Sequence, residues 1–307
     1  MSSEKVRIDI CVATYRRPAL LSVLVASLLR QKVDDGLRFR IVIVDNDAAQ
    51  TARTVVESFI SSPVPIIYAV EPVQGISFAR NRCVSLCEGK YAAFIDDDEY
   101  ADDNWLQCMM NTMERFNADI VLGPVIPLLP PDVSPWITVG KFFERCRYTT
   151  GASLTDSTIG NIGNTLIRHE VLTSVPGPFD PEFALTGGED SVFFAAARQK
   201  GVSIIWCDTA TVYETIPTER TNLLWLACRA FRCGQGHARL WMKQHGYFYG
   251  LFWLLYRVVH LFATIAAALV ALPMRTDIRA KFFLKVCRNL GRLFAVTGLN
   301  YREYVRK

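Results

Sequence analysis

The first hundred residues alternate between short apolar runs and segments with helical periodicity. The apolar run from Ile8 to Ala13 predicts a buried strand, and Pro18 then begins a segment whose leucines recur at helical spacing. The same alternation predicts strands at 41–44, 66–70 and 91–95 and helices at 51–60 and 75–86. Strands that alternate with helices are typical of an α/β fold with a mostly parallel, doubly wound sheet.

Beyond residue 100 the pattern is less regular. A helix is predicted near 105–116, and prolines between 124 and 135 then interrupt any long element. A strand at 164–168, a helix at 189–198 and a strand at 204–206 complete the predicted core. We expect the irregular middle region to shape the wall of a pocket.

An apolar segment and a basic tail follow the predicted core. Residues 251–272 are apolar enough to span a membrane, although Arg257 and His260 interrupt them. From 275 to 307 the chain carries nine Lys and Arg residues against Asp277 and Glu303. A single span would carry this basic tail outward against the positive-inside tendency. An interfacial or re-entrant helical region, with 247–307 in contact with lipid, therefore fits better, while true spanning and an ordinary buried helix pair stay open.

Composition narrows the class of protein. A chain of 307 residues, half of them apolar, can bury one large core with a small appendage. The formal charge of +4 is too small to indicate nucleic-acid binding. The nine cysteines are scattered without a CxxC pair, which indicates reduced thiols. Because the first residues are charged and lack the apolar segment of a signal peptide, we expect a location in the cytosol or on the cytoplasmic face of the inner membrane.

The sharpest chemical signal is a predicted strand that ends in four acids, Asp96 to Glu99. Ligands bind at the carboxyl ends of strands in open α/β sheets, where Asp45 is also expected. Adjacent carboxylates repel one another, and a hard divalent cation such as Mg²⁺ or Mn²⁺ would compensate them. In an extended segment Asp96 and Asp98 would share one face. The alternative is a solvated acidic turn that caps the next helix.

A second acidic pair begins a predicted helix. Two glycines at 187 and 188 permit a tight backbone path, and Glu189 and Asp190 follow in the first helical turn. Acids at this end of a helix are favoured by the helix dipole, so capping alone would explain them. A carboxylate close to a hydroxyl group could instead act as a general base.

Five motifs occur in an order that resembles the inverting family 2 glycosyltransferases of the GT-A fold. They are Ala13–Arg17, Val44–Asp47, Gly75–Asn81, Ala93–Glu99 and Gly187–Asp190. The resemblance covers about residues 6 to 240 and looks closest to enzymes that assemble succinoglycan-type exopolysaccharides. Gly123–Val125 and Arg229–Gln235 also fit that branch.

The resemblance implies roles on the donor side of a transferase site. Thr14, Tyr15, Arg16 and Asp45 would hold the nucleoside, with Asp45 accepting the uracil N3–H. The donor diphosphate and sugar would lie near a second set of residues, which is Arg80, Asp96 and Asp97. Asp98 would bind the metal directly, and Asp96 would complete the Asp-x-Asp element.

On the acceptor side, the resemblance makes Asp190 the general base and Glu189 an acceptor-binding residue or a fallback base. Relatives often carry histidine where this chain has Tyr213, which puts any histidine contribution in doubt. A single displacement, with no covalent sugar–enzyme intermediate, would invert the anomeric configuration.

The implied function is transfer of a hexose, glucose first among them, from a UDP-sugar to a polyprenyl-diphosphate-linked oligosaccharide. Residues 1–240 would form the catalytic domain, with a nucleotide-binding half (1–100) and an acceptor-binding half (101–240). Residues 241–307 would form a membrane-associating helical region. Two alternatives stay open: a noncatalytic, membrane-associated assembly subunit, and a metal-dependent nuclease or phosphatase that uses the acids as a two-metal site.

Overall fold

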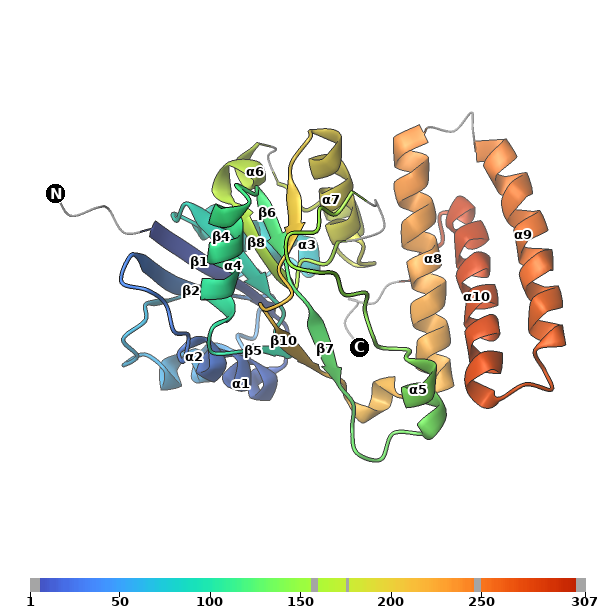
Figure 1. Ribbon diagram of the computed structural model, residues 1–307, viewed down its shortest axis with the longest axis horizontal. Coiled ribbons are helices and arrows are strands. Elements are labelled where there is room, and N and C mark those ends of the chain that lie inside the picture. The colour runs from blue at the N-terminus through green and yellow to red at the C-terminus, as the bar shows by residue number, and fades with distance from the viewer. Residues whose placement is uncertain (1–5, 156–159, 175–176, 246–249, 302–307) are drawn as a thin grey trace.

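The protein is described by a computed structural model that covers residues 6–155, 160–174, 177–245 and 250–301 (Figure 1). Within these residues a seven-stranded sheet has the order β3-β2-β1-β4-β8-β6-β9. Its strands are β1 Val6–Thr14, β2 Leu37–Asp45, β3 Ile66–Val70, β4 Tyr91–Ile95, β6 Ile120–Leu122, β8 Asn164–Arg168 and β9 Ile204–Trp206. Strand β8 is antiparallel to β4 and β6, and the other pairs are parallel. The expectation of a mostly parallel α/β sheet is confirmed.

Alternate residues of β1 pack against different helices, which explains its continuous apolar sequence. Ile8 and Ile10 join the core beneath α1 (Pro18–Leu28) and α4 (Trp105–Arg115), with α2 (Arg53–Ser58) at its edge. Cys11 faces the second core, against α3 (Ile76–Leu86) and α7 (Glu189–Gln199). Because helices cover both faces, these strand residues are almost fully buried.

A small second sheet extends from the carboxyl end of β4. It has the order β5-β10-β7, formed by β5 (Glu99–Ala101), β10 (Val212–Thr215) and β7 (Val125–Leu128). Between β4 and β5, residues 96–98 form a turn in which the Glu99 amide donates to the Asp96 carbonyl at 3.1 Å. The expectation that Asp96 and Asp98 share a face of an extended segment is therefore wrong, because this segment is a turn.

Four short helical elements complete the described part of the chain before residue 223. They are α5 (Pro135–Gly140), α6 (His169–Thr173), η1 (Pro181–Phe183) and η2 (Thr218–Arg220).

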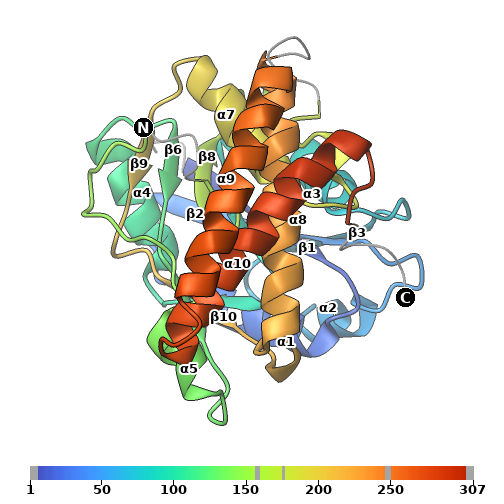
Figure 2. The same cartoon turned by 90° about the vertical axis from the view of Figure 1, so that its right-hand side faces the viewer.

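Three long helices form a layer beside the sheet: α8 (Leu223–His245), α9 (Gly250–Val270) and α10 (Thr276–Phe294), followed by the short η3 (Ala295–Thr297). Figures 1 and 2 show α10 packed against both α8 and α9, with α8 nearest the sheet. The domain boundary expected at residue 240 falls inside α8, so this helix belongs to both regions.

Two glycines let α8 and α10 approach closely. A methyl group on Gly234 would overlap the carbonyl oxygen of Arg288, and one on Gly291 would overlap that of Phe231. The neighbouring Gln235 accepts a hydrogen bond from the amide of Tyr301 at 2.8 Å and donates to the carbonyl of Leu299 at 2.7 Å. Gly234 therefore lets α10 pack closely on α8, and Gln235 holds the segment after η3 against α8.

Helix α9 is apolar and largely uncovered. Its window Trp253–Val270 is long and apolar enough to cross a membrane, and only 6% of it is buried. Among the described residues no other helix passes this test, which rests on length and composition alone. Its exposed apolar side chains include Tyr256, Val259 and Phe262. Helix α9 is therefore not a core helix of this chain.

Candidate active site

A cleft of about 390 Å³ lies at the carboxyl ends of β1 and β4. The sheet side contributes Thr14, Arg80 and the turn of residues 96–98, and α8 contributes Trp225 and Arg229 on the opposite side. The volume is in the range of small-molecule sites, and the position is where open α/β sheets bind ligands.

Asp97 fastens the loop after β1 to the turn after β4. Its carboxylate accepts hydrogen bonds from the Thr14 hydroxyl at 2.8 Å and from Arg17 Nη1 at 2.8 Å. Burial raises the pKa of Asp97 to about 6, while the positive charge of Arg17 opposes that rise. The hydrogen bond between Thr14 and Asp97 therefore fixes the positions of two residues that line the cleft.

The other two carboxylates of the turn lie in the cleft wall with arginine partners. Asp98 Oδ2 accepts from Arg17 at 3.0 Å and from Arg220 at 3.3 Å, and its side chain is 10% exposed. Asp96 accepts from Arg80 Nη2 at 2.8 Å, and its side chain is 35% exposed. Asp96 is therefore the more accessible of the two.

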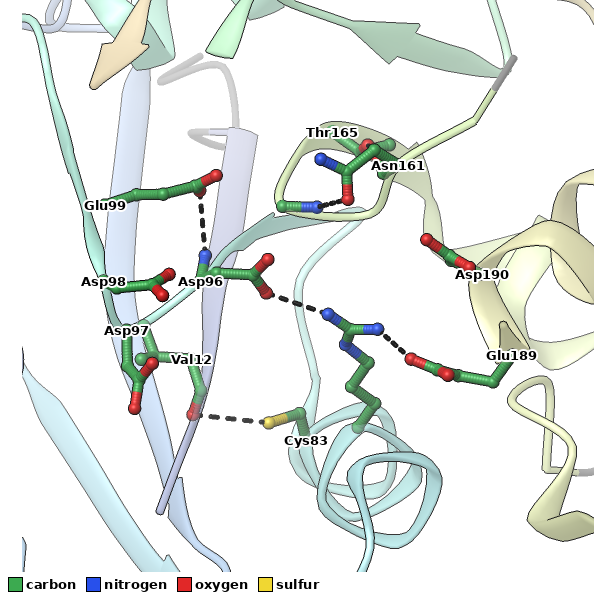
Figure 3. Close-up of polar contacts among 12 residues, drawn as sticks. Val12, Cys83, Asp96, Asp97, Asp98, Glu99, Asn161, Thr165, Glu189 and Asp190 are labelled. Atoms are coloured by element: carbon green, nitrogen blue, oxygen red, sulfur yellow. Dashed lines mark hydrogen bonds and ion pairs between the residues drawn. The ribbon is translucent and has the colours of Figure 1, made fainter. Parts of the chain in front are cut away.

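Arg80 links the acidic turn to the start of α7. In Figure 3 these two contacts are the dashed lines that end on the labelled Asp96 and Glu189. One end of the Arg80 guanidinium contacts Asp96 and the other contacts Glu189, which is 2% exposed. Burial raises the pKa of Glu189 to about 7, although Arg80 opposes the shift. Because Glu189 is buried and bound to Arg80, the geometry assigns it to positioning Arg80 and does not support its use as a fallback base.

Asp190 lies next to Glu189 and is partly exposed. Its Oδ1 accepts from the Ser191 amide at 2.6 Å and from the Ser191 hydroxyl at 3.4 Å, so both of these contacts are to the next residue of the chain. Figure 3 shows it on the Asn161 side of Glu189. Among the described residues it is not one of those that line the cleft itself. Its Oδ2 atom is the end of the carboxylate that could receive a proton.

Asp45 is the last residue of β2, at the carboxyl end where it was expected, but its side chain is turned inward. It is fully buried, and its oxygens accept from the Asp47 amide at 3.0 Å, the Ala52 amide at 2.9 Å and the Tyr68 hydroxyl at 3.0 Å. Both oxygens thus accept hydrogen bonds within the loop after β2, and among the described residues Asp45 is not one that lines the cleft. Its contact with a uracil N3–H stays a prediction. The adjacent Asn46 lines the cleft instead.

Tyr15 lies in the cleft, and Arg16 lies outside it. Tyr15 lines the cleft, whereas Arg16 is exposed, donates to Asp47 Oδ2 at 3.0 Å and lies over the Tyr15 ring at 5.1 Å. Arg16 therefore supports Tyr15 from outside the cleft.

The opposite wall consists of residues that were not predicted from the sequence as site residues. Arg145 pairs with Glu214 at 2.6 Å, and both line the cleft with Arg220, Arg229 and Arg232. Tyr213 does not line it, because its ring stacks on Tyr100 with centroids 5.1 Å apart. Of the motifs named from the sequence, Arg229–Gln235 is the one that contributes residues to this wall.

The carboxylates of the cleft fit a hard divalent ion whose other ligands are the phosphates of a substrate. Across the described residues no three His, Cys, Asp or Glu side chains are grouped as ligands. Mg²⁺ and Mn²⁺ are commonly held by one or two carboxylates and by substrate phosphates. Asp98 and Asp96 both offer carboxylate oxygens at the cleft wall and match that pattern.

Solved structures and curated sequences identify the class of protein. The chain superposes on S. aureus TarS 1-349 in complex with UDP-GlcNAc with a TM-score of 0.54 and 15% identity, covering 97% of this chain and 93% of that one. This likeness shows the GT-A glycosyltransferase fold.

Residues 9–166 match the family described as Glycosyl transferase family 2, and the chain belongs to that family. It is 36% identical to the succinoglycan biosynthesis protein ExoM of Rhizobium meliloti (strain 1021), over 80% of this chain and 79% of that protein. It is 25% identical to the glucosyl-dolichyl phosphate glucuronosyltransferase of Haloferax volcanii, over 76% of each. The protein is a glycosyltransferase, which argues against the nuclease and phosphatase alternatives.

Proposed function

We propose that the protein transfers a hexose, glucose first among them, from a UDP-sugar to a lipid-linked oligosaccharide in bacterial exopolysaccharide assembly. The relative named for succinoglycan biosynthesis supports the pathway class. The TarS complex with UDP-GlcNAc supports a UDP-sugar donor, and the relative named for a dolichyl phosphate supports a lipid-linked acceptor.

The observation that carries the proposal is the chain of contacts from Asp96 through Arg80 to Glu189. It joins the end of β4 to the start of α7, where Asp190 follows Glu189 in the first turn. These groups hold their positions before substrate arrives, and preorganised charges of this kind stabilise a transition state without rearranging.

The proposed reaction is a single displacement. The acceptor hydroxyl oxygen bonds to the anomeric carbon as the bond to the diphosphate breaks, and its proton passes to Asp190. Asp98 and Asp96 would hold Mg²⁺ or Mn²⁺, which when bound offsets the charge of the leaving diphosphate. Arg80 would lie beside the diphosphate, and attack from the opposite side inverts the configuration.

The exposed face of α9 and the basic residues of α10 support a position on the cytoplasmic leaflet. Side chains such as Val259 and Phe262 offer an apolar contact, and Arg275, Lys281 and Lys285 offer charge to anionic headgroups. We propose that this region lies in the interface, without a complete span.

A donor screen tests the function. The purified full chain is incubated with Mg²⁺ or Mn²⁺ and each UDP- or GDP-sugar, while nucleotide release and the thermal shift are measured. We expect a UDP-specific signal that EDTA abolishes. Cleavage of nucleic acid, or indifference to every sugar nucleotide, would contradict the proposal.

A further inference from the structure

Arg229 lies in the cleft between two aromatic rings. Its guanidinium carbon is 5.7 Å from the ring centroid of Phe143 and 5.5 Å from that of Trp225. Burial lowers its pKa, and the charge of Arg145 adds to that effect. Among the described residues no carboxylate forms an ion pair with Arg229, although the other arginines of this wall, Arg145 and Arg220, do have carboxylate partners.

The cleft carries more positive than negative side chains. Among the described residues, six arginines and four carboxylates line it. The four carboxylates already contact other arginines, as in the pairs of Asp96 with Arg80 and Glu214 with Arg145. A half-buried guanidinium that faces a cavity without an anion is a ready contact for a phosphate.

The rings beside Arg229 line the cleft, and they belong to a hydrophobic cluster that also borders a separate apolar groove. Phe143 and Trp225 belong to a hydrophobic cluster that includes Trp136. On the other side of that cluster, Trp136 and Leu223 line a groove of about 510 Å³ with residues of α9 and α10. Those residues are Ile265, Ala268, Leu269, Leu272, Thr276, Arg279, Ala280, Phe283 and Val286.

The groove is open, and it lies at the end of the helical layer where α8 begins. Leu269 and Leu272 are 62% and 60% exposed, although both are large apolar side chains. Figures 1 and 2 both show α5, which carries Trp136, at this end of the layer. A cation with no described carboxylate partner and an uncovered apolar groove thus border one aromatic cluster, which matches a ligand with a phosphate head and a hydrocarbon chain.

We propose that Arg229 and this groove form one binding track for the lipid-linked acceptor. Arg229 contacts a phosphate of a prenyl diphosphate, and the groove takes the first isoprenoid units. The inference rests on the proposed function, because that function supplies a lipid-linked acceptor. It adds the residues that bind the lipid part of that acceptor.

Calorimetric titration of the full-length protein tests the track with three probes: farnesyl diphosphate, farnesol and UDP. Arg229→Gln should weaken farnesyl diphosphate about tenfold or more and leave farnesol and UDP within about twofold, since a charged hydrogen bond contributes roughly 1.5–3 kcal/mol. Arg229→Lys keeps the charge and should lie between wild type and Arg229→Gln. UDP binding verifies that each variant is folded.

The groove is tested with a matched pair of variants on α9. Leu269→Glu lies in the groove, and Val259→Glu lies outside it on the same helix with a similar exposure, 68% against 62%. Leu269→Glu should weaken both farnesyl diphosphate and farnesol about tenfold, and Val259→Glu should weaken neither. Farnesyl diphosphate should also bind when UDP is saturating.

Three results would overturn the inference. Equal weakening of UDP and farnesyl diphosphate by Arg229→Gln would make Arg229 a donor contact. Equal effects of the two α9 variants would show that the groove is not the chain site, and displacement of farnesyl diphosphate by UDP would show that the two ligands share one site. If UDP binds normally while the prenyl probes do not, only this inference fails; if no UDP-sugar binds or reacts, the proposed function fails.

Discussion

The two walls of the cleft balance their charges differently. On the sheet side, Asp97 is held by Thr14 and Arg17, and Arg80 is held between Asp96 and Glu189. On the α8 side, Arg229 lies against two aromatic rings, and among the described residues no carboxylate forms an ion pair with it. The charged side chains of the sheet side are therefore held in place before a substrate binds. The α8 side instead carries positive charge that an anionic substrate would offset.

The largest effect should follow from a change at the base on the sheet side. Asp190→Asn removes the proton acceptor and should lower turnover by about a hundredfold or more, with UDP affinity nearly unchanged. Steady-state nucleotide release and calorimetric titration with UDP check both quantities. The control is Glu189→Gln: if it reduced turnover far more than Asp190→Asn, then Glu189 would be the base.

A smaller effect is expected at the metal-binding carboxylate. Asp98→Asn should weaken UDP about tenfold in the presence of Mn²⁺, because a charge-assisted contact to the ion is lost. With EDTA present, wild type and variant should bind UDP alike. If neither EDTA nor the substitution changed the affinity for UDP, Asp98 would not be a metal ligand.

The buried pair of Glu189 and Arg80 predicts a dependence of stability on pH. The pKa of Glu189 rises from 4.5 to about 7 on folding, so the folded state holds the proton more tightly than the unfolded state does. The stability that comes from this proton is fully present below pH 4.5 and is lost as the pH rises to about 7. Between these values wild type should lose on the order of 2–3 kcal/mol relative to Glu189→Gln. Urea unfolding of both proteins across this range measures the difference, and parallel pH curves would refute it.

The smallest effect concerns the support of the α8 wall. Gly234→Ala should destabilise the protein by about 1–3 kcal/mol, since the added methyl group overlaps the carbonyl of Arg288. Gly236→Ala is the matched control, because nothing lies within 4 Å of the added group. The control should be neutral or stabilise by up to about 1 kcal/mol. Equal melting temperatures for the two variants would mean that α8 and α10 do not approach as closely as described.

The sheet side could be predicted well from the sequence because its signals are local. The apolar run of 91–95 predicts strand β4 with the same bounds, and Asp96, Asp97 and Asp98 after it do line the cleft. One local detail was wrong, because Glu99 closes a turn where an extended segment was expected. Nothing in the sequence indicated that the loop after β2 would enclose the side chain of Asp45.

The α8 side could not be predicted in the same way, because its contacts join distant parts of the chain. Arg220 reaches Asp98 across 122 residues, and Arg145 follows a proline-rich region without a regular period. No local pattern specifies which arginine turns toward a cleft. Arg229 lay within a recognised motif, but its position between two rings depends on how α8 packs against Phe143.

The central claim is that one sugar lies between Asp98 and Asp190, and a crystal structure with a UDP-sugar and Mn²⁺ tests it most directly. We expect an ion in contact with Asp98 and the diphosphate, and an anomeric carbon whose open side faces the Asp190 carboxylate. A donor bound outside the cleft, or an anomeric carbon with no space between it and Asp190 for an acceptor hydroxyl, would contradict the account.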